Sequence, residues 1–474
     1  MRGCSRLRTN YPMKHTIKSM LIAAAALTAV SSFAQDKATL DLLVKKGLIT
    51  AEERAKTLDE ASQARAASGV GRVFPKEDAT KRLTISGYFQ AQYENFVFTD
   101  STNVARQTQS SFLMRRLYLE LLADIGEGIS GNVVFDMSGN TASSIDRAIV
   151  TLAGSNGTID MGYKKVAWGY EESTLSSLFK ASSSKLLTVE RGITNRYWNE
   201  AENNGGAAGN YSTDGESAGR RLGFGAHHLG LHYTSVANPQ GLEYGLSVTN
   251  SAQGFANKGL NDVAVYANAV WNNKVSDNEK YAVGVNYGTG KYFNGTTTTG
   301  PVTGAVSNTL AKVEGYNPFA QIQYFNWLLN AEYFSTTVHN VDDGESINHK
   351  PTGYNATVAY KINDNWEGVV RYTSLDTDKR GQKIADGVRD FNKVGGKSDD
   401  VYDKSNSWYA GVNYYFTIPV AGAAAVNGPN AKIQLGLERA KFEDKVTAVA
   451  TGINTTSAQS ANVDTVRLQA QIAF

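Results

Sequence analysis

From residue 83 to its last residue, the sequence repeats short segments in which apolar and polar residues alternate. LTISGYFQAQYE (83–94) and the terminal VRLQAQIAF (466–474) show this most clearly. Side chains of a β-strand point to opposite faces in turn, so each segment predicts a strand with one apolar and one polar face. The segments are about 8 to 12 residues long, which is the length a tilted strand needs to cross a membrane.

The number and spacing of these segments predict a barrel. We count sixteen, at 83–95, 112–124, 131–138, 145–153, 157–165, 221–235, 242–251, 261–272, 279–290, 315–325, 327–338, 352–361, 365–375, 405–417, 431–442 and 462–474. Connections after even-numbered strands are mostly short, whereas those after odd-numbered strands are mostly long and polar, including 166–220, 291–314, 376–404 and 443–461. Short turns on one side and long loops on the other are typical of an outer-membrane barrel.

A secreted β-sandwich or propeller is the alternative fold. Its apolar faces would turn inward against a second sheet, and it has no reason to sort loop lengths by strand parity. We therefore predict an all-β fold over residues 81–474: a transmembrane antiparallel β-barrel of about 16 strands. The terminal strand is expected to pair with the first one, which removes both sheet edges.

The first 34 residues predict a secretory signal peptide. Lys14 and Lys18 precede the apolar run MLIAAAALTAV (20–30), and SFA (32–34) forms a small-x-small cleavage site. An uncleaved membrane anchor is the alternative, but this run is shorter than the ~20 residues that span a bilayer. The start at Met13 also fits, because MKHTIKSM opens such a signal well.

Residues 35–80 predict a periplasmic helical segment and linker. ATLDLLVKK (38–46) ends at Gly47, and TAEE (50–53) forms a capping box for a second helix that reaches about residue 66. A partly ordered linker and a periplasmic helical hairpin or coiled coil both fit this short N-terminal helical segment.

Charge and composition exclude several classes of protein. Without the first 34 residues the chain has 42 basic and 45 acidic residues, so it lacks the basic excess of a nucleic-acid-binding protein. The only cysteine, Cys4, lies in the predicted signal, so no disulfide is expected in the rest. No later stretch approaches 18 consecutive apolar residues, which excludes a helical membrane protein.

In a barrel of this kind the polar face lines the lumen, because hydrocarbon cannot solvate charge. In strand two this places Arg116 inward, whereas Arg115 has outward parity and is expected at the rim or at a bulge. The other charged residues predicted to line the channel from the strands are Glu94, Glu120, Asp136, Asp160, Lys164, Glu332, Arg371, Lys432, Glu438 and Arg467. A lumen with charges of both signs predicts a water-filled channel, since sixteen strands leave an aqueous bore.

Strands two to five and the loop after them resemble the phosphate-selective porin O and P family of Gram-negative outer membranes. The resemblance rests on FLMRRLYLEL, on SIDRAIVTL and on GTIDMGYKKVAWGYEESTLSSLFKASSSKLLTVERGITN. In that family a strand ending in G-x-x-K-x-x-x-G-x-E leads into a loop that closes with an aliphatic residue and Glu-Arg. The matching residues here are Gly162, Lys165, Gly169, Glu171 and Val189-Glu190-Arg191.

This resemblance implies a sixteen-stranded homotrimer whose third long loop folds into the lumen and narrows it. Residues 166–220 contain the matching loop. Selective members use arginine and lysine clusters to guide anions, which implies an anion path here along Arg116, Lys164, Lys165, Arg191, Arg196 and Arg371. The loop also carries acidic residues, including Glu171, so ordinary lumen charges balanced by carboxylates are the alternative.

Other motifs carry little weight. His228 and His232 share a strand face but lie ~13 Å apart, too far for one metal ion. The acidic loop stretches 342–345 and 399–403 could hold calcium, although solvated loop charge is the commoner explanation. No nucleophile elbow, zinc-protease helix or P-loop is present, so we predict neither an enzyme nor a cofactor. A hydrolase built from a serine or carboxylate constellation would leave no such motif.

The predicted function is passive diffusion of small hydrophilic solutes, with anions such as phosphate among them, through the outer membrane of a Gram-negative bacterium. The rival is a secreted or surface β-rich binding or adhesion protein that uses its long loops. The expected partners are outer-membrane lipid, two further copies of the chain and the barrel-assembly machinery, but no nucleic acid. Phe474 resembles the terminal residue by which that machinery recognises bacterial outer-membrane proteins.

Overall fold

The computed structural model describes residues 44–46, 50–52, 83–101, 103–126, 128–138, 144–171, 186–199, 222, 224–250, 263–293, 310–342, 345–391, 400–418, 431–447 and 455–473. The chain divides into two compact units, 1–79 and 80–474. Within the first, residues 44–45 and 51–52 are helical, and the rest of the predicted segment 38–66 lies outside the described residues. The predicted signal peptide and Phe474 also lie outside them.

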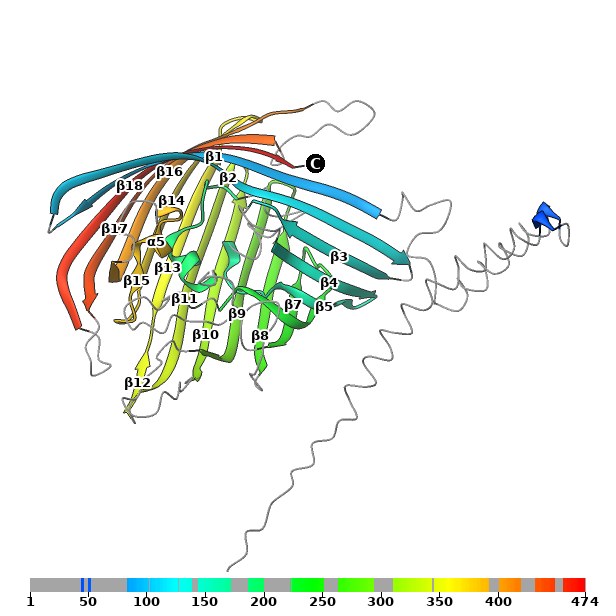
Figure 1. Ribbon diagram of the computed structural model, residues 1–474, viewed down its shortest axis with the longest axis horizontal. Coiled ribbons are helices and arrows are strands. Elements are labelled where there is room, and N and C mark those ends of the chain that lie inside the picture. Colours follow the sequence, from blue (N-terminus) through cyan, green and yellow to red (C-terminus); the bar gives the residue numbers. More distant parts are fainter. Residues whose placement is uncertain are drawn as a thin grey trace, which may run out of the picture. The chain divides into compact units, whose positions relative to one another are not determined.

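Sixteen long strands form the described part of the second unit (Figure 1). They are β1 (Leu83–Asp100), β2 (Asn103–Gly126), β3 (Ile129–Asp136), β4 (Ser144–Gly154), β5 (Gly157–Lys165), β6 (His227–Ser235), β7 (Leu242–Asn250), β8 (Val263–Lys274), β9 (Glu279–Phe293), β10 (Leu310–Tyr324), β11 (Trp327–Asp342), β13 (Thr352–Lys361), β14 (Trp366–Asp376), β16 (Val401–Tyr415), β17 (Ala431–Thr447) and β18 (Thr455–Ala473). The short elements are β12 (Glu345–His349), β15 (Gln382–Lys383), α4 (Ile193–Asn199) and α5 (Ile384–Gly387). None of the helices in these described ranges is long and apolar enough to cross a membrane.

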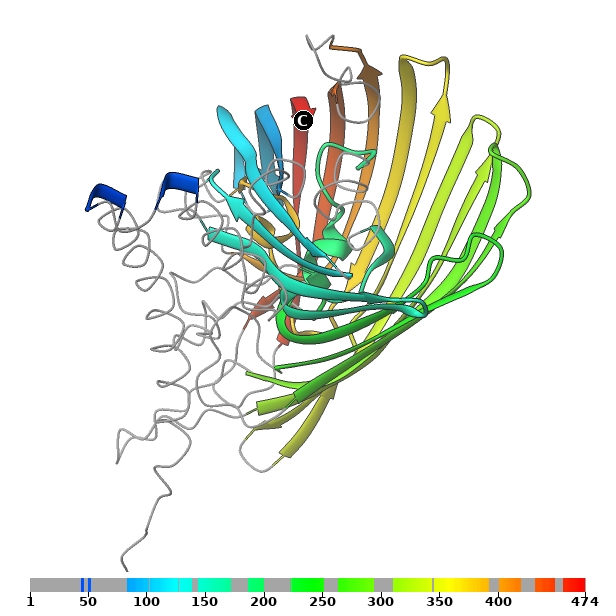
Figure 2. The same cartoon turned by 90° about the vertical axis from the view of Figure 1, so that its right-hand side faces the viewer.

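The long strands close into one antiparallel barrel (Figure 2). Each pairs with the next long strand along the chain, and β1 also pairs with β18, from Tyr88–Ala473 to Asp100–Ala461. The predicted sixteen-stranded barrel is therefore confirmed. Inside this seam, Gln90 Nε2 donates to Gln469 Oε1 at 2.7 Å, and Gln469 Nε2 donates to Gln92 Oε1 at 2.6 Å.

The sixth predicted strand begins too early in the sequence. β6 starts at His227, not at residue 221, because the preceding residues pair with the loop after β5 instead of a strand. Leu222 N donates to Tyr197 O at 2.8 Å, and Gly225 N donates to Trp198 O at 3.0 Å. A Cβ at Gly225 would lie 1.8 Å from Asn199 Oδ1, so only glycine allows this close approach.

The outward face is apolar and carries two rows of aromatic side chains from β9 to β16. One row is Tyr287, Tyr316, Tyr333, Tyr354, Tyr372 and Trp408, and the other is Tyr281, Tyr324, Trp327, Tyr360, Trp366 and Tyr414. Some neighbours within a row are directly opposite across strands, as Tyr333 is to Tyr354, and others are offset along the strand, as Tyr354 and Tyr372 are. Two such rows mark the two membrane–water interfaces of a barrel.

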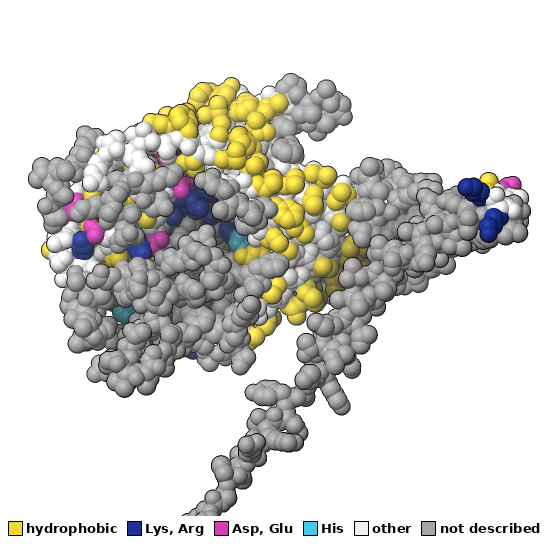
Figure 3. Space-filling view, in the orientation of Figure 1, with side chains coloured by type: hydrophobic (Ala, Val, Ile, Leu, Met, Phe, Trp, Pro, Cys, Tyr) yellow, Lys and Arg dark blue, Asp and Glu magenta, His cyan; other side chains and the backbone are white. Residues whose placement is uncertain are grey.

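The outward face from β17 through β1 to β5 has a different composition, and we call it the aliphatic arc. Apart from Phe112, its exposed large apolar side chains are aliphatic or methionine: Ile85, Met114, Ile125, Met137, Ile145, Val150, Leu152, Ile159, Met161, Ile433, Leu435, Leu437, Val466, Leu468 and Ile472. In the space-filling view, apolar side chains cover the wall over β1 to β4 (Figure 3).

The inward face is polar over part of each strand and apolar toward the long-loop side. On β1 the inward residues Gln90, Gln92 and Glu94 are followed by Phe96 and Phe98, which are buried. Phe96 and Phe98 belong to an interior apolar layer that also contains inward side chains of β8, β10, β11, β14 and β16–β18 and residues of two loops. The expectation that the inward face is polar throughout is wrong here, because loop residues inside the barrel cover this part of the strands.

Candidate functional site

A β-bulge in β2 turns two consecutive arginines into the barrel. The pairing of β1 with β2 shifts between Gln90 and Ala91, which face Arg116 and Met114, so Arg115 is the extra residue of the bulge. A bulge places one additional residue opposite a single partner and redirects its side chain. Arg115 and Arg116 are both buried, whereas Met114 is exposed on the outward face. The bulge predicted for Arg115 is thus present, and it directs this side chain inward.

Arg115 binds the loop that follows β5. Its Nε donates to Glu190 Oε1, and its Nη2 donates to Glu190 Oε2 at 3.1 Å, so the contact is bidentate. Both side chains are buried. Burial by itself raises the pKa of the Glu190 carboxyl, but the guanidinium groups of Arg115, Arg116 and Arg389 outweigh burial and hold this pKa well below its ordinary value. Glu190 is therefore a carboxylate at neutral pH.

The described loop residues 186–199, which include α4, pack against inward side chains of the strands. Val189 N donates to the hydroxyl of Tyr409 on β16 at 3.2 Å. Thr194 Oγ1 donates to Ser374 O on β14 at 2.9 Å. The ring of Trp198 stacks on Phe334 of β11 with centroids 4.8 Å apart. Three strands of the wall thus hold this segment inside the barrel.

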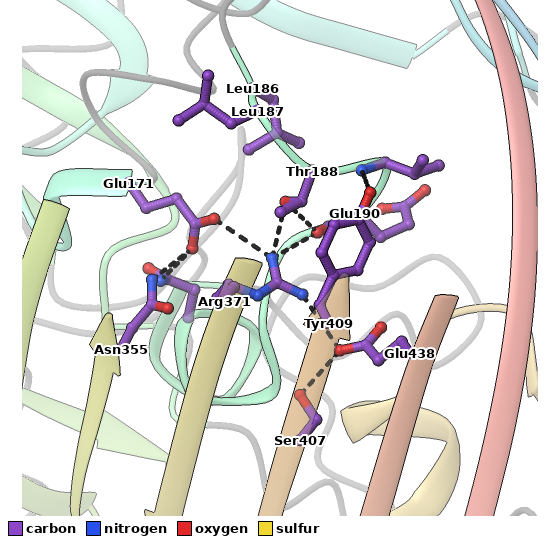
Figure 4. A network of polar contacts seen from close by, with 12 residues as sticks. Glu171, Leu186, Leu187, Thr188, Glu190, Asn355, Arg371, Ser407, Tyr409 and Glu438 are labelled. Atoms are coloured by element: carbon purple, nitrogen blue, oxygen red, sulfur yellow. Dashed lines mark hydrogen bonds and ion pairs between the residues drawn. The ribbon is translucent and has the colours of Figure 1, made fainter. Parts of the chain in front are cut away.

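Arg371 of β14 is the central residue of that attachment (Figure 4). Its Nη1 donates to Thr188 Oγ1 at 2.8 Å and to Glu190 O at 2.7 Å, and it lies 3.4 Å from Glu171 Oε1. Its Nη2 donates to Glu438 Oε1 on β17 at 3.1 Å. Arg371 is 0% exposed. Its guanidinium therefore contacts the loop and the wall and does not face the water through which an ion would pass.

A second polar group holds the beginning of the same loop. Asn195 Nδ2 donates to Glu171 Oε2 at 2.6 Å and to Glu332 Oε1 at 2.8 Å. Asn355 Nδ2 contacts the same two carboxylates at 2.8 and 3.2 Å. Tyr170 N also donates to Glu332 Oε2 at 2.7 Å. Residues 170–171 and α4 are therefore held together against β11 and β13.

The loop after β14 also folds into the barrel, which the sequence did not indicate. α5 packs on α4, and Arg196 Nη2 donates to Ala385 O at 3.5 Å. Ile384, Val388 and Phe391 are buried in the interior apolar layer. Two loops of different origin therefore occupy the interior beside the arginines of β2.

The other predicted site residues lie in separate places. Lys164 forms an ion pair with Asp160 on its own strand. Lys165 and Arg191 are half-buried, at the end of β5 and on the loop respectively. Glu120 accepts hydrogen bonds from Ser86 and Asn132, and Asp136 accepts them from Ser138. Glu94 lies 3.7 Å from Arg467 across the β1–β18 seam. Arg191 and Arg196 thus belong to the loop after β5, and Arg116 lies next to Arg115, which binds that loop. Lys164 lies apart from them, with Asp160.

The histidines of β6 do not form a metal site in the described part of the chain. His232 Nδ1 lies 2.9 Å from Ser247 Oγ, and His228 Nδ1 lies 3.2 Å from Asn250 O. No group of three or more His, Cys, Asp or Glu side chains in these ranges is placed to hold a metal ion.

The family model for phosphate-selective porin O and P matches residues 83–427. The chain belongs to this family. It is an outer-membrane porin of a Gram-negative bacterium, a channel for passive diffusion. Family and fold point to a channel and not to an enzyme.

Comparison with solved structures gives distant resemblances of the porin fold. They include DcaP of Acinetobacter baumannii (11% identity, TM-score 0.46, covering 83% of this chain and 97% of that one). They also include OmpF of Salmonella typhi in complex with daunomycin (14%, 0.45, 83% and 97%) and OprB of Pseudomonas putida (11%, 0.47, 84% and 96%). The comparison of this chain with curated proteins finds no match.

Proposed function

We propose that this porin prefers anions, phosphate among them, and that the loops inside the barrel narrow its diffusion path. The observation that carries the proposal is the charge of these loops and of the β2 bulge. Within the described residues, their buried or half-buried basic side chains number seven and the acidic ones six: Arg115, Arg116, Arg191, Arg196, Arg380, Lys383 and Arg389 against Glu171, Glu190, Asp378, Asp386, Asp390 and Asp400. Rings of basic side chains favour anions in a pore. The space-filling view shows lysine and arginine side chains gathered in a hollow (Figure 3).

Reversal potential in a salt gradient tests this preference. We expect the wild-type channel to be anion-selective, and Arg116→Gln together with Lys165→Gln to lower the ratio of anion to cation permeability by about twofold or more. The control is Lys361→Gln, which removes a half-exposed charge next to Asp364 at the short-turn end of β13. A cation-selective wild-type channel would overturn the proposal, and an unchanged double variant would remove Arg116 and Lys165 from the path.

We also infer that the porin is a homotrimer whose copies meet through the aliphatic arc. Aromatic side chains are favoured where a barrel meets the membrane interface. The arc carries scattered outward aromatic residues such as Phe89, Tyr93, Phe112 and Phe135, whereas β9–β16 carry two full rows. The exposed apolar residues of the arc approach the about 20–30 a side of a stable interface.

A tryptophan scan separates interface from lipid contact. We expect Val150→Trp on β4 to reduce the trimer fraction on semi-native gels, because a bulky ring in a packed interface clashes. Val358→Trp on β13 should leave the trimer intact, because tryptophan is tolerated against lipid. These valines are 48% and 38% exposed in the single chain, which makes them a matched pair. Equal trimer fractions in both variants would place the interface elsewhere.

The remaining assignments rest on the sequence alone. We propose residues 1–34 as a signal peptide, 35–80 as a periplasmic helical segment and linker, and Phe474 as a recognition residue for the barrel-assembly machinery. The pattern of charges and apolar residues supports the first, and the capping box at 50–53 supports the second.

A further inference from the structure

The loop between β14 and β16 is anchored inside the barrel on both sides of one arginine. Val388 and Phe391 are 3% and 0% exposed. The ring of Phe391 meets Phe96 edge-on with centroids 5.9 Å apart, and it contacts Phe98 at 5.5 Å. Arg389, between these two anchors, stays half-buried.

Hydrogen bonds and backbone geometry fix this arginine further. Arg467 of β18 donates from Nη2 to the carbonyl oxygen of Arg389 at 3.2 Å. Asp390 has a φ of +62°, in the left-handed region that ends a tight turn. Long loops that connect strands usually run over the surface. A loop held by two apolar anchors and a wall arginine instead presents Arg389 at a fixed place.

The positive charge of Arg389 stabilises the carboxylate of Glu190, which joins the loop after β5 to Arg115 of β2. Burial raises the pKa of Glu190, and Arg115, Arg116 and Arg389 together lower it. The carboxylate of Asp390 also interacts electrostatically with Arg115 and with Glu94. Arg389–Asp390 therefore lies in the same electrostatic neighbourhood as the arginines of the β2 bulge, although it comes from the opposite part of the sequence.

We propose that residues 384–391 are a second selectivity element of the channel, and that Arg389 sets its anion preference jointly with Arg116. This inference rests on the proposed anion preference. The loop after β5 supplies the carboxylate Glu190, which neutralises Arg115 through a bidentate contact. Arg116 donates to the side chain of Gln90 at 2.6 Å. Arg389 adds a positive charge from the other loop, so a passing anion meets cations from two elements.

The test measures reversal potential for Arg389→Gln, Arg389→Lys and a control on the same loop. Arg389→Gln should lower the anion-to-cation permeability ratio by about twofold or more, while Arg389→Lys should keep most of it. The control Lys379→Gln removes the same charge from an exposed side chain ten residues earlier and should leave the ratio unchanged. A wild-type channel without anion preference would refute the proposed function itself. An anion-selective wild type with an unchanged Arg389→Gln would overturn only this inference.

A cysteine variant guards against a folding defect. Cys4 is the only cysteine in the sequence, so Cys4→Ser with Arg389→Cys offers one thiol to membrane-bound channels that already conduct. A positively charged thiosulfonate reagent should restore anion preference, and a negatively charged one should reduce it further. Equal permeability ratios after both reagents would overturn a role for this charge and leave Arg389 a packing residue.

Discussion

Replacing Arg371 with methionine is expected to destabilise the porin by about 3–5 kcal/mol, because it leaves the buried carboxylate of Glu171 without its cation. Arg371 joins Glu171, Thr188 and the carbonyl of Glu190 on one loop to Glu438 on β17. With it removed, the loop after β5 should detach from the wall, so the channel should also conduct more and fluctuate more. Thermal unfolding of the purified porin and single-channel recording measure the two effects.

Arg439→Met is the matched control for this experiment. Arg439 also pairs with a carboxylate from the barrel wall, since its Nε lies 3.6 Å from Asp464 Oδ1. Its side chain is 68% exposed and that of Asp464 is 50% exposed, and such surface pairs contribute about 0–1 kcal/mol. If Arg371→Met and Arg439→Met unfold at the same temperature and conduct alike, Arg371 does not anchor the loop.

The Arg115–Glu190 pair should show strong coupling in a double-mutant cycle. Arg115→Met and Glu190→Met should each destabilise the porin by about 3–5 kcal/mol, because each leaves a buried charge without its partner. The double variant should be destabilised by much less than the sum, since both charges leave together. Denaturant unfolding of the four proteins gives the coupling energy, and additive effects would contradict a direct buried pair.

Acid gives a further readout for the same cycle. The pKa of Glu190 is lower in the folded porin than in the unfolded chain, so its contribution is present above the ordinary glutamate pKa. That contribution is lost as pH falls through the lowered value. The wild-type porin should lose stability in strong acid by this route, and the double variant should lack this part of the loss.

The sequence predicts the wall of the barrel well, because one period-two pattern specifies both strand position and facing. Outward Val466, Leu468 and Ile472 are exposed as expected, and inward Arg467 and Gln469 are buried. The pattern fails where the surroundings change. Phe96 and Phe98 keep the inward parity of Glu94 but lose its polarity, because they face loop residues and not water.

The loops could be predicted only in part. The paired arginines of FLMRR break the alternation of strand two, which indicates a bulge or a rim position for Arg115. Alternation alone cannot show that a bulge points Arg115 inward. Family resemblance pointed to the loop after β5. Nothing comparable marked the loop after β14, because its sequence is polar like that of an external loop, and Ile384, Val388 and Phe391 are too few to form a periodic pattern. Attachment sites such as Thr188 and Asn355 depend on contacts between distant residues that have no local signature.

The seam between β1 and β18 and the attachment of the loops use different chemistry. Within the barrel, the backbone pairing of the seam is supplemented by the amides of Gln90, Gln92, Gln469 and Gln471, which do not titrate. Glu94 and Arg467 form an ion pair beside them. The loops are held largely by carboxylates and guanidinium groups, such as Glu190 with Arg115. The amide hydrogen bonds of the seam therefore persist at any pH, whereas the bidentate contact of Glu190 with Arg115 is lost in strong acid. The porin can rearrange its interior in acid while its outline in the membrane stays closed.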